Sequence, residues 1–209
     1  ILHTVSQLGL LHLGFILLPM IVVYGLEAAG WQVTLGSHAR KIGFFRLFAI
    51  RMAGETVNVT TPTAYVGGEP LKAYLLKRYG VPMVDGLASV ITAKTSMTLA
   101  QVFFILLGLA LTFWIVGDPV HYWVAMFVSV GVLAFGVGLL VLLQRHGIGM
   151  GCLGMLRACG IRLAFLEKRE PQLRELDGTI RSFYSQHRQT FYAALALFFL
   201  AWLTETLEV

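Results

Sequence analysis

The sequence has 209 residues, of which 57% are hydrophobic and 13% are charged. Because soluble domains usually carry about 25% charged residues, this composition excludes an ordinary soluble globular fold. The formal net charge of +5 does not indicate nucleic-acid binding, since in a chain this apolar the position of each Lys and Arg matters more than their sum.

Four apolar stretches are long enough to cross a membrane. Residues 97–116 and 122–143 contain no Asp, Glu, Lys or Arg, and about 20 such residues cross a hydrocarbon core about 30 Å thick. Residues 8–30 are apolar apart from His12 and Glu27. We therefore predict an all-α fold, a polytopic transmembrane helix bundle, with membrane spans at residues 8–30, 97–116, 122–143 and 190–209.

Both ends of the sequence look incomplete. The chain starts at Ile1 without an initiator Met, and the last apolar stretch stops as soon as it would have crossed the bilayer. The start also lacks the basic region and cleavage site of a signal peptide, which indicates a mature first span. We expect residues 1–209 to be a single transmembrane domain and a fragment of a longer protein.

The basic residues are distributed unevenly between the loops. Residues 1–7 and 117–121 contain no Lys or Arg. Residues 144–189 carry eight of them: Arg145, Arg157, Arg162, Lys168, Arg169, Arg174, Arg181 and Arg188. By the positive-inside rule, the first two segments face outward and residues 144–189 form a cytoplasmic segment. Within this segment we expect a helix on each side of Pro171.

Residues 43–78 are expected to enter the membrane and return to the same side, because basic clusters flank this segment at both ends. A single continuous helix is excluded by Pro62 and by the cluster of Gly67, Gly68 and Pro70. We predict a re-entrant or broken-helix hairpin, which a membrane tolerates where protein or water surrounds the exposed backbone. A cytoplasmic or interfacial loop is the alternative.

The helical pattern that contains the second span is longer than a bilayer is thick. It runs from Val81 to Val116, so its first part, about residues 83–95, is expected to be interfacial or strongly tilted. Lys94 lies where the two parts meet.

Arg51, Glu55 and Asn58 are spaced by four and then three residues, which places their side chains on one face of a helix. Charged groups at membrane depth are costly and normally face a cavity or a partner, and an Arg51–Glu55 pair would lower that cost. Two interpretations stay open. Either the pair only pins the hairpin, or the polar face serves a ligand.

The second half of the hairpin contains Gly67, Gly68, Glu69, Pro70 and Lys72. The glycines permit a backbone turn, Pro70 suits the first helical position, and a helix start with free N–H groups attracts anions. At headgroup depth these amides and Lys72 would bind a lipid phosphate, while Glu69 would pair with Lys72 or with a cationic headgroup. A plain capped turn is the alternative.

The hairpin motifs occur in the order Gly54-Glu55-x-x-Asn58, Pro62, Gly67-Gly68-Glu69 and Lys72. This ordered set resembles the flippase-like family that includes the transmembrane region of lysylphosphatidylglycerol synthase. Residues 66–69, 100–104 and 207–209 look closest to its hopanoid-associated branch. The resemblance covers roughly residues 44–113 and the final helix.

The resemblance implies a multi-pass protein of the bacterial inner (plasma) membrane that handles lipids, with the polar hairpin near a lipid-binding cavity. Many relatives have Arg at the position of Lys94, so a bidentate phosphate contact is not expected there. In the synthase, aminoacyl transfer belongs to a separate soluble domain. We expect no catalytic residue, cofactor or metal site, since the histidines are scattered and Cys152 and Cys159 lack a CxxC spacing.

The predicted substrate-binding residues are Arg51, Glu55, Asn58, Gly67, Gly68, Glu69, Lys72 and Lys94. The first hypothesis is a flippase that translocates a phospholipid or a related amphiphile. The second is a non-transporting membrane scaffold that binds a lipid-biosynthesis enzyme through residues 144–189, and the third is a membrane-embedded transferase that uses Glu55 or Glu69. Membrane lipids are thus the expected partners. A polar cavity reached from the lipid would favour the first hypothesis, and a tightly packed hairpin would favour the second.

Overall fold

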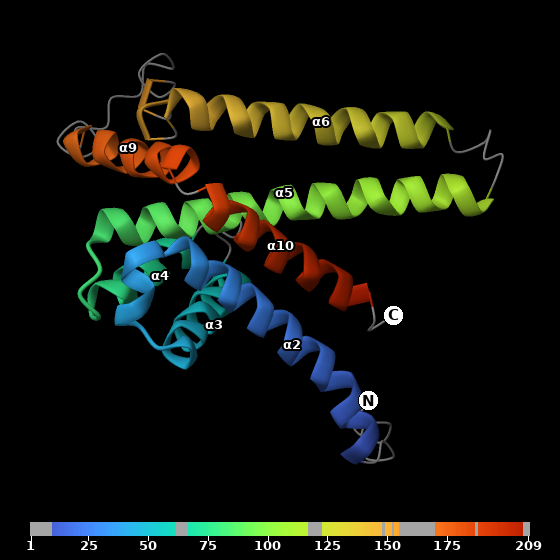
Figure 1. Cartoon of the computed structure of the whole chain (residues 1–209), viewed down its shortest axis with the longest axis horizontal. Helices are drawn as coiled ribbons and strands as arrows, with labels where there is room; N and C mark the ends of the chain where they lie inside the picture. The colour runs from blue at the N-terminus through green and yellow to red at the C-terminus, as the bar shows by residue number, and fades with distance from the viewer. Residues whose placement is uncertain are drawn as a thin grey trace.

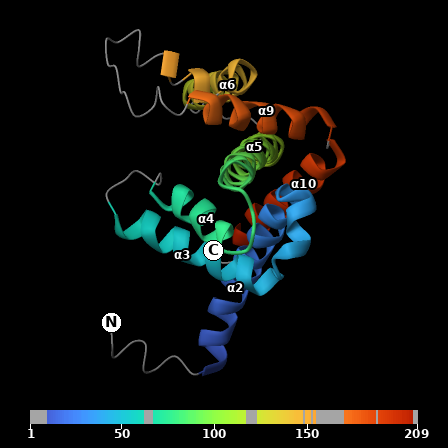
Figure 2. The same ribbon diagram turned by 90° about the vertical axis from the view of Figure 1, so that its left-hand side faces the viewer.

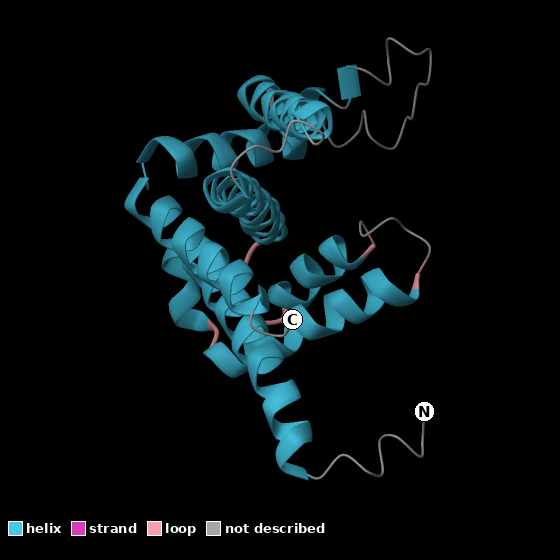
Figure 3. Cartoon of the chain, turned by 90° about the vertical axis from the view of Figure 1, so that its right-hand side faces the viewer, coloured by secondary structure: helices cyan, strands magenta, loops and turns pink. Residues whose placement is uncertain are grey.

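The computed structural model describes residues 10–61, 67–116, 123–147, 149–151, 153–154, 170–186 and 188–206. Over these residues the regular secondary structure is helical, with no β-strand, which confirms the predicted all-α class (Figure 3). The elements are α2 (Leu10–Thr34), the 3-10 helix η1 (Gly36–Lys41), α3 (Phe44–Thr60), α4 (Gly68–Lys77), α5 (Met83–Val116), α6 (Trp123–His146), α9 (Glu170–Gln186) and α10 (Arg188–Glu205) (Figure 1).

Helix α5 is the element around which the others are arranged. Helices α6 and α9 lie on one of its sides, and α2, α3 and α4 lie on the other (Figures 1 and 2). Its 34 residues form one unbroken helix, about 51 Å long at 1.5 Å per residue. The predicted helical extension ahead of the second span is therefore confirmed, and it is continuous with that span.

Two of the described helices are long and apolar enough to cross a membrane, α2 over Leu17–Thr34 and α5 over Met83–Ile115. Helix α6 contains a shorter apolar run, Met126–Gly136. The stretches predicted as spans at residues 122–143 and 190–209 are α6 and α10, and their passage across the bilayer stays a prediction. Many large apolar side chains on α5 and α6 are exposed, including Trp114, Phe127 and Phe135. Such faces suit contact with lipid or with further helices.

The segment predicted as a hairpin consists of two short helices that lie side by side, α3 and α4 (Figure 2). Helix α3 ends at Thr60, and α4 begins at Gly68. The predicted break at Pro62 falls between them and lies outside the described residues. The structure thus has the two arms of a broken-helix hairpin, whereas re-entry into a membrane stays a prediction.

The apolar core lies where α2, α5 and α10 meet the hairpin. Trp31 of α2, Leu47 of α3, Leu76 of α4 and Phe198 of α10 are all buried in one cluster. Gly30 allows α2 and α10 to approach closely, because a Cβ there would lie 2.9 Å from Cζ of Phe198. Small residues commonly permit such close packing between membrane helices.

Helix α9 packs on the first part of α5 through one apolar face. Leu176 and Ile180 are buried against Ala88 of α5. The Asp177 carboxylate accepts hydrogen bonds of 2.9 Å from the backbone N–H groups of Gly149 and Met150, which ties α9 to the chain that follows α6. Of the two helices expected on either side of Pro171, the later one is α9, and the earlier one would fall on residues 155–169, which lie outside the described residues. Pro171 is the second residue of α9, a place where its missing N–H costs no hydrogen bond.

We expect Gly30→Ala to lower the free energy of unfolding by about 1–3 kcal/mol, because the buried Phe198 ring has little room to move. Gly25→Ala is the matched control in the same helix, since a Cβ at Gly25 meets nothing within 4 Å. That change should be neutral or stabilise the helix by up to about 1 kcal/mol. Thermal unfolding in detergent measures both, and equal melting temperatures would contradict the close contact between α2 and α10.

Candidate functional site

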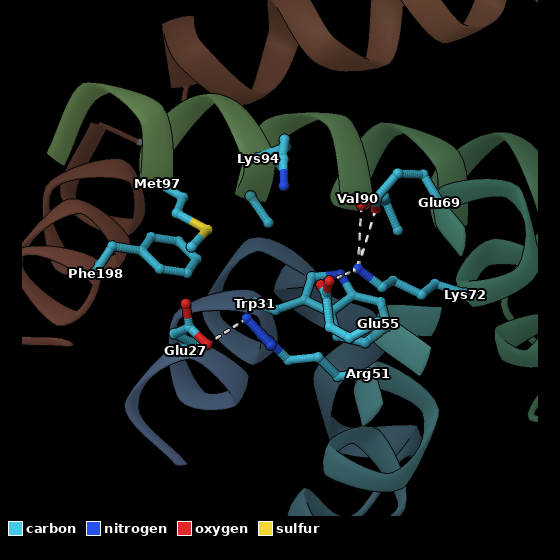
Figure 4. Close-up of a pocket in the computed structure, with 11 residues that line it drawn as sticks. Glu27, Trp31, Arg51, Glu55, Glu69, Lys72, Val90, Lys94, Met97 and Phe198 are labelled. Carbon is cyan, nitrogen blue, oxygen red and sulfur yellow. Dashed lines mark hydrogen bonds and ion pairs between the residues drawn. The ribbon is translucent and has the colours of Figure 1, made fainter. Parts of the chain in front are cut away.

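A small cavity lies between α2, the hairpin, α5 and α10 (Figure 4). It contains about 340 Å³ of empty space including its mouth. The side chains leave room inside for only about one or two water molecules. Six charged residues line the cavity together with five less polar ones: Glu27, Arg51, Glu55, Glu69, Lys72 and Lys94, with Trp31, Val90, Ala93, Met97 and Phe198.

Arg51 and Glu27 form a buried ion pair that joins α3 to α2. Arg51 Nη2 donates a hydrogen bond to Glu27 Oε2, and each residue is 6% exposed. The other terminal nitrogen, Arg51 Nη1, is buried and has no acceptor among the described residues. The expected pairing of Arg51 with Glu55 is therefore wrong, because the Arg51 guanidinium pairs with Glu27, 24 residues earlier in the chain.

Lys72 of α4 is shared by two carboxylates. Its Nζ donates to Glu55 Oε1 at 2.8 Å and to Glu69 Oε1 at 3.2 Å. The side-chain amide of Asn58 donates to both carboxylates, at 3.3 Å in each case. One ammonium thus faces two carboxylates, so this group of three charges has a formal surplus of one negative charge. The expected Glu69–Lys72 contact is present, and Glu55 joins it across the hairpin.

A side chain from the first arm of the hairpin, α3, caps the N-terminus of α4. The Gly68 N–H donates to Asn58 Oδ1 at 2.7 Å, so this amide is not free for an anion as the sequence interpretation assumed. Gly67 has φ −66° and ψ −34°, which any residue can adopt, so it is not required for a turn. Pro70 is the third residue of α4 and not the first. The capped start is the alternative that the sequence left open.

Gly68 is required for a different reason, the close approach of the two hairpin arms. A Cβ at this position would collide with the Gly54 carbonyl oxygen and would lie 2.7 Å from Asn58 Oδ1. Likewise, a Cβ at Gly54 would overlap the methylene chain of Lys72. Two glycines therefore let α3 and α4 cross closely enough for Lys72 to reach Glu55.

Lys94 enters the site from α5, on the wall opposite Arg51 (Figure 4). Its side chain is exposed, and its ammonium makes no ion pair with any residue in the described part of the chain. Of the three cations around the cavity, Arg51 and Lys72 are buried and paired, whereas Lys94 stands at the mouth.

The structure thus brings together most of the side chains that the sequence pointed to. Arg51, Glu55, Glu69, Lys72 and Lys94 line the cavity. Asn58 and Gly68 do not line the cavity. Asn58 hydrogen-bonds to Glu55 and Glu69, and Gly68 hydrogen-bonds to Asn58. Gly67 precedes α4 and does not line the cavity either. Sequence reasoning missed Glu27. Its signal was present, since a lone carboxylate within an apolar helix needs a partner.

The comparisons with known proteins agree with this architecture. Residues 1–209 match the family described as the lysylphosphatidylglycerol synthase TM region. A UPF0104 membrane protein of Methanothermobacter thermautotrophicus is 26% identical over 204 residues, covering 90% of this chain and 58% of the relative. This chain therefore spans somewhat more than half the length of that relative. No solved structure matches the chain.

The fold and the site together define a class of protein: a membrane protein whose apolar helices surround a polar hairpin. More particularly, the chain belongs to the lysylphosphatidylglycerol synthase TM region family. The resemblance inferred from the hairpin motifs is thereby confirmed at the level of the family, and with it a membrane location. The likeness to the hopanoid-associated branch stays a prediction.

We expect Gly68→Ala to separate the hairpin arms and to lower the free energy of unfolding by about 1–3 kcal/mol, because the colliding atom belongs to the backbone. Gly178→Ala, on exposed α9, is the control, since a Cβ there meets nothing within 4 Å. Thermal unfolding in detergent compares the two variants. A Gly68→Ala protein as stable as the parent would show that the arms do not cross as closely as described.

Proposed function

We propose that this chain is the lipid-handling part of a membrane translocator, a flippase for a phospholipid or a related amphiphile. The observation that carries the proposal is the cavity lined by six charged side chains among apolar helices. Charged side chains within a membrane are costly, and they normally face a cavity or a partner. Such a site offers a polar headgroup the ionic contacts that hydrocarbon lacks, while acyl chains stay beside the exposed apolar faces.

The proposed topology follows from the basic residues and from the helices. We place the protein as a multi-pass protein in the bacterial inner membrane, with α2, α5, α6 and α10 crossing and with α3 and α4 entering and returning. Residues 144–189, which include α9, then lie on the cytoplasmic side. Among the described residues, α2 and α5 contain stretches long and apolar enough to cross, which supports this placement.

Cysteine labelling tests the topology. In a Cys152→Ser, Cys159→Ser background, a membrane-impermeant reagent should label Asp118→Cys from outside and spare Glu175→Cys. Asp118 lies outside the described residues, and Glu175 is exposed on α9. The reverse labelling pattern would contradict the proposed orientation.

The scaffold hypothesis is the alternative, and one observation favours it. Both buried cations of the hairpin, Arg51 and Lys72, are paired with carboxylates, and the cavity holds little free space, as expected of a hairpin that is only locked in place. In that case the basic residues of 144–189 would bind a lipid-biosynthesis enzyme. A transport measurement separates the two hypotheses.

We expect Glu55→Gln and Glu69→Gln to reduce lipid translocation by about tenfold or more, because each removes a charge that faces the cavity. The measurement is the flipping rate of a fluorescent phospholipid in proteoliposomes, normalised to folded protein. Glu175→Gln makes the same charge change on exposed α9 and should leave the rate unchanged. If less lipid is translocated only because less protein is folded, the normalised rate stays unchanged. An unchanged normalised rate would favour the scaffold hypothesis.

A further inference from the structure

The charges around the cavity are balanced in number but not in position. Three carboxylates and three cations line it, so their formal sum is zero. Arg51 and Glu27 neutralise each other between α3 and α2. What remains is the surplus negative charge at Glu55, Lys72 and Glu69 on the hairpin, and the unpaired Lys94 ammonium on α5.

These two remaining charges face the cavity from opposite walls. The hairpin carboxylates lie on one wall, and Lys94 points in from α5 (Figure 4). No ion pair closes the gap among the described residues, so Lys94 lies more than 4.0 Å from each of the three cavity carboxylates. The cavity therefore offers a negative and a positive subsite on opposite walls.

The buried guanidinium is a second, independent observation at the cavity. Arg51 is 6% exposed and lines the cavity, yet its Nη1 has no acceptor among the described residues. A buried donor without an acceptor is destabilising, and more so when the group is charged. Since Arg51 lines the cavity, an oxygen atom that enters and reaches the guanidinium would satisfy this donor. This observation points to a ligand that brings an oxygen atom into the cavity.

We propose that the cavity selects a zwitterionic headgroup that carries a phosphate and a primary ammonium, as phosphatidylethanolamine does. This inference rests on the proposed function and adds its substrate class. The ammonium binds the surplus carboxylate at Glu55 and Glu69, and the phosphate binds Lys94 on the opposite wall. Formal charge then balances at each subsite as well as in sum.

The other common headgroup types leave one subsite unsatisfied. A purely anionic headgroup of the phosphatidylglycerol type contacts Lys94 but brings no cation to the hairpin carboxylates. A quaternary ammonium has the right charge but no N–H to donate, and carboxylates are acceptors only. A primary ammonium offers three donors. The lining side chains leave too little room for a headgroup. Binding therefore requires side chains at the mouth of the cavity to move, where Lys94 is exposed.

The test is a lipid titration of the purified protein in detergent, read as the shift in melting temperature. Phosphatidylethanolamine, phosphatidylglycerol and phosphatidylcholine are compared with identical acyl chains. We expect phosphatidylethanolamine to act at a concentration about tenfold lower than the other two. Equal potency of the three lipids, or a preference for phosphatidylglycerol, would overturn the proposal.

Two opposite charge changes then test the assignment of the subsites. Glu69→Gln gives the lining a formal charge of +1 and should move the preference to phosphatidylglycerol. Lys94→Met gives it −1 and should weaken both lipids by about tenfold while improving the binding of a cationic lipid. Glu175→Gln and Lys77→Met make the same charge changes at exposed positions outside the cavity and should change nothing. If each variant matches its control, the proposal fails.

Further arms keep the outcome clear. Should Glu69→Gln fail to fold, Glu55→Gln makes the same charge change on the other arm of the hairpin. Free phosphoethanolamine is titrated in parallel, and stabilisation by it alone, without an effect of the lipid, would overturn the lipid assignment. Translocation that shows no headgroup preference would overturn this inference and leave the proposed function standing. Selective binding without translocation would do the opposite.

Discussion

Charge buried in apolar surroundings is the constraint on which the rest of this structure depends. Arg51 and Lys72 are each 6% exposed, and each is held by a carboxylate from a different helix. Breaking such a pair by removing one partner typically costs about 3–5 kcal/mol. Helices α2, α3 and α4 are therefore coupled, because none of them can move away alone without leaving a charge unpaired. The close crossing at Gly54 and Gly68 makes this coupling sterically possible.

Local sequence rules predicted the hairpin well, since they act over a few residues. The spacing of Arg51, Glu55 and Asn58 placed them on one helical face, and all three turn toward α4 or the cavity. The break between α3 and α4 follows from helix-breaking residues in the same way. Helix α5 was recognised from its long apolar pattern.

Partner identities were predicted less well, because they depend on how separate helices pack. Arg51 has carboxylates at 24 residues before it and at four residues after it, and only the packing of α2 against α3 selects Glu27. The same holds for Asn58, whose side chain caps α4 ten residues later. From sequence, Gly68 looked like a turn residue, whereas its role is to let two helices touch. No local pattern distinguishes these two uses of glycine.

The length of α5 sets the depth of the cavity in a bilayer. From Thr95 to Val116 this helix has 22 residues, about 33 Å, which matches a hydrocarbon core about 30 Å thick. If α5 crosses with this stretch, Lys94 lies at the boundary between acyl chains and headgroups, and residues 83–94 continue beyond it. The cavity then opens at the level of a single leaflet. On that placement a headgroup would enter the cavity from one face of the membrane, and along the rest of α5 it would meet no charged residue of that helix before the opposite leaflet.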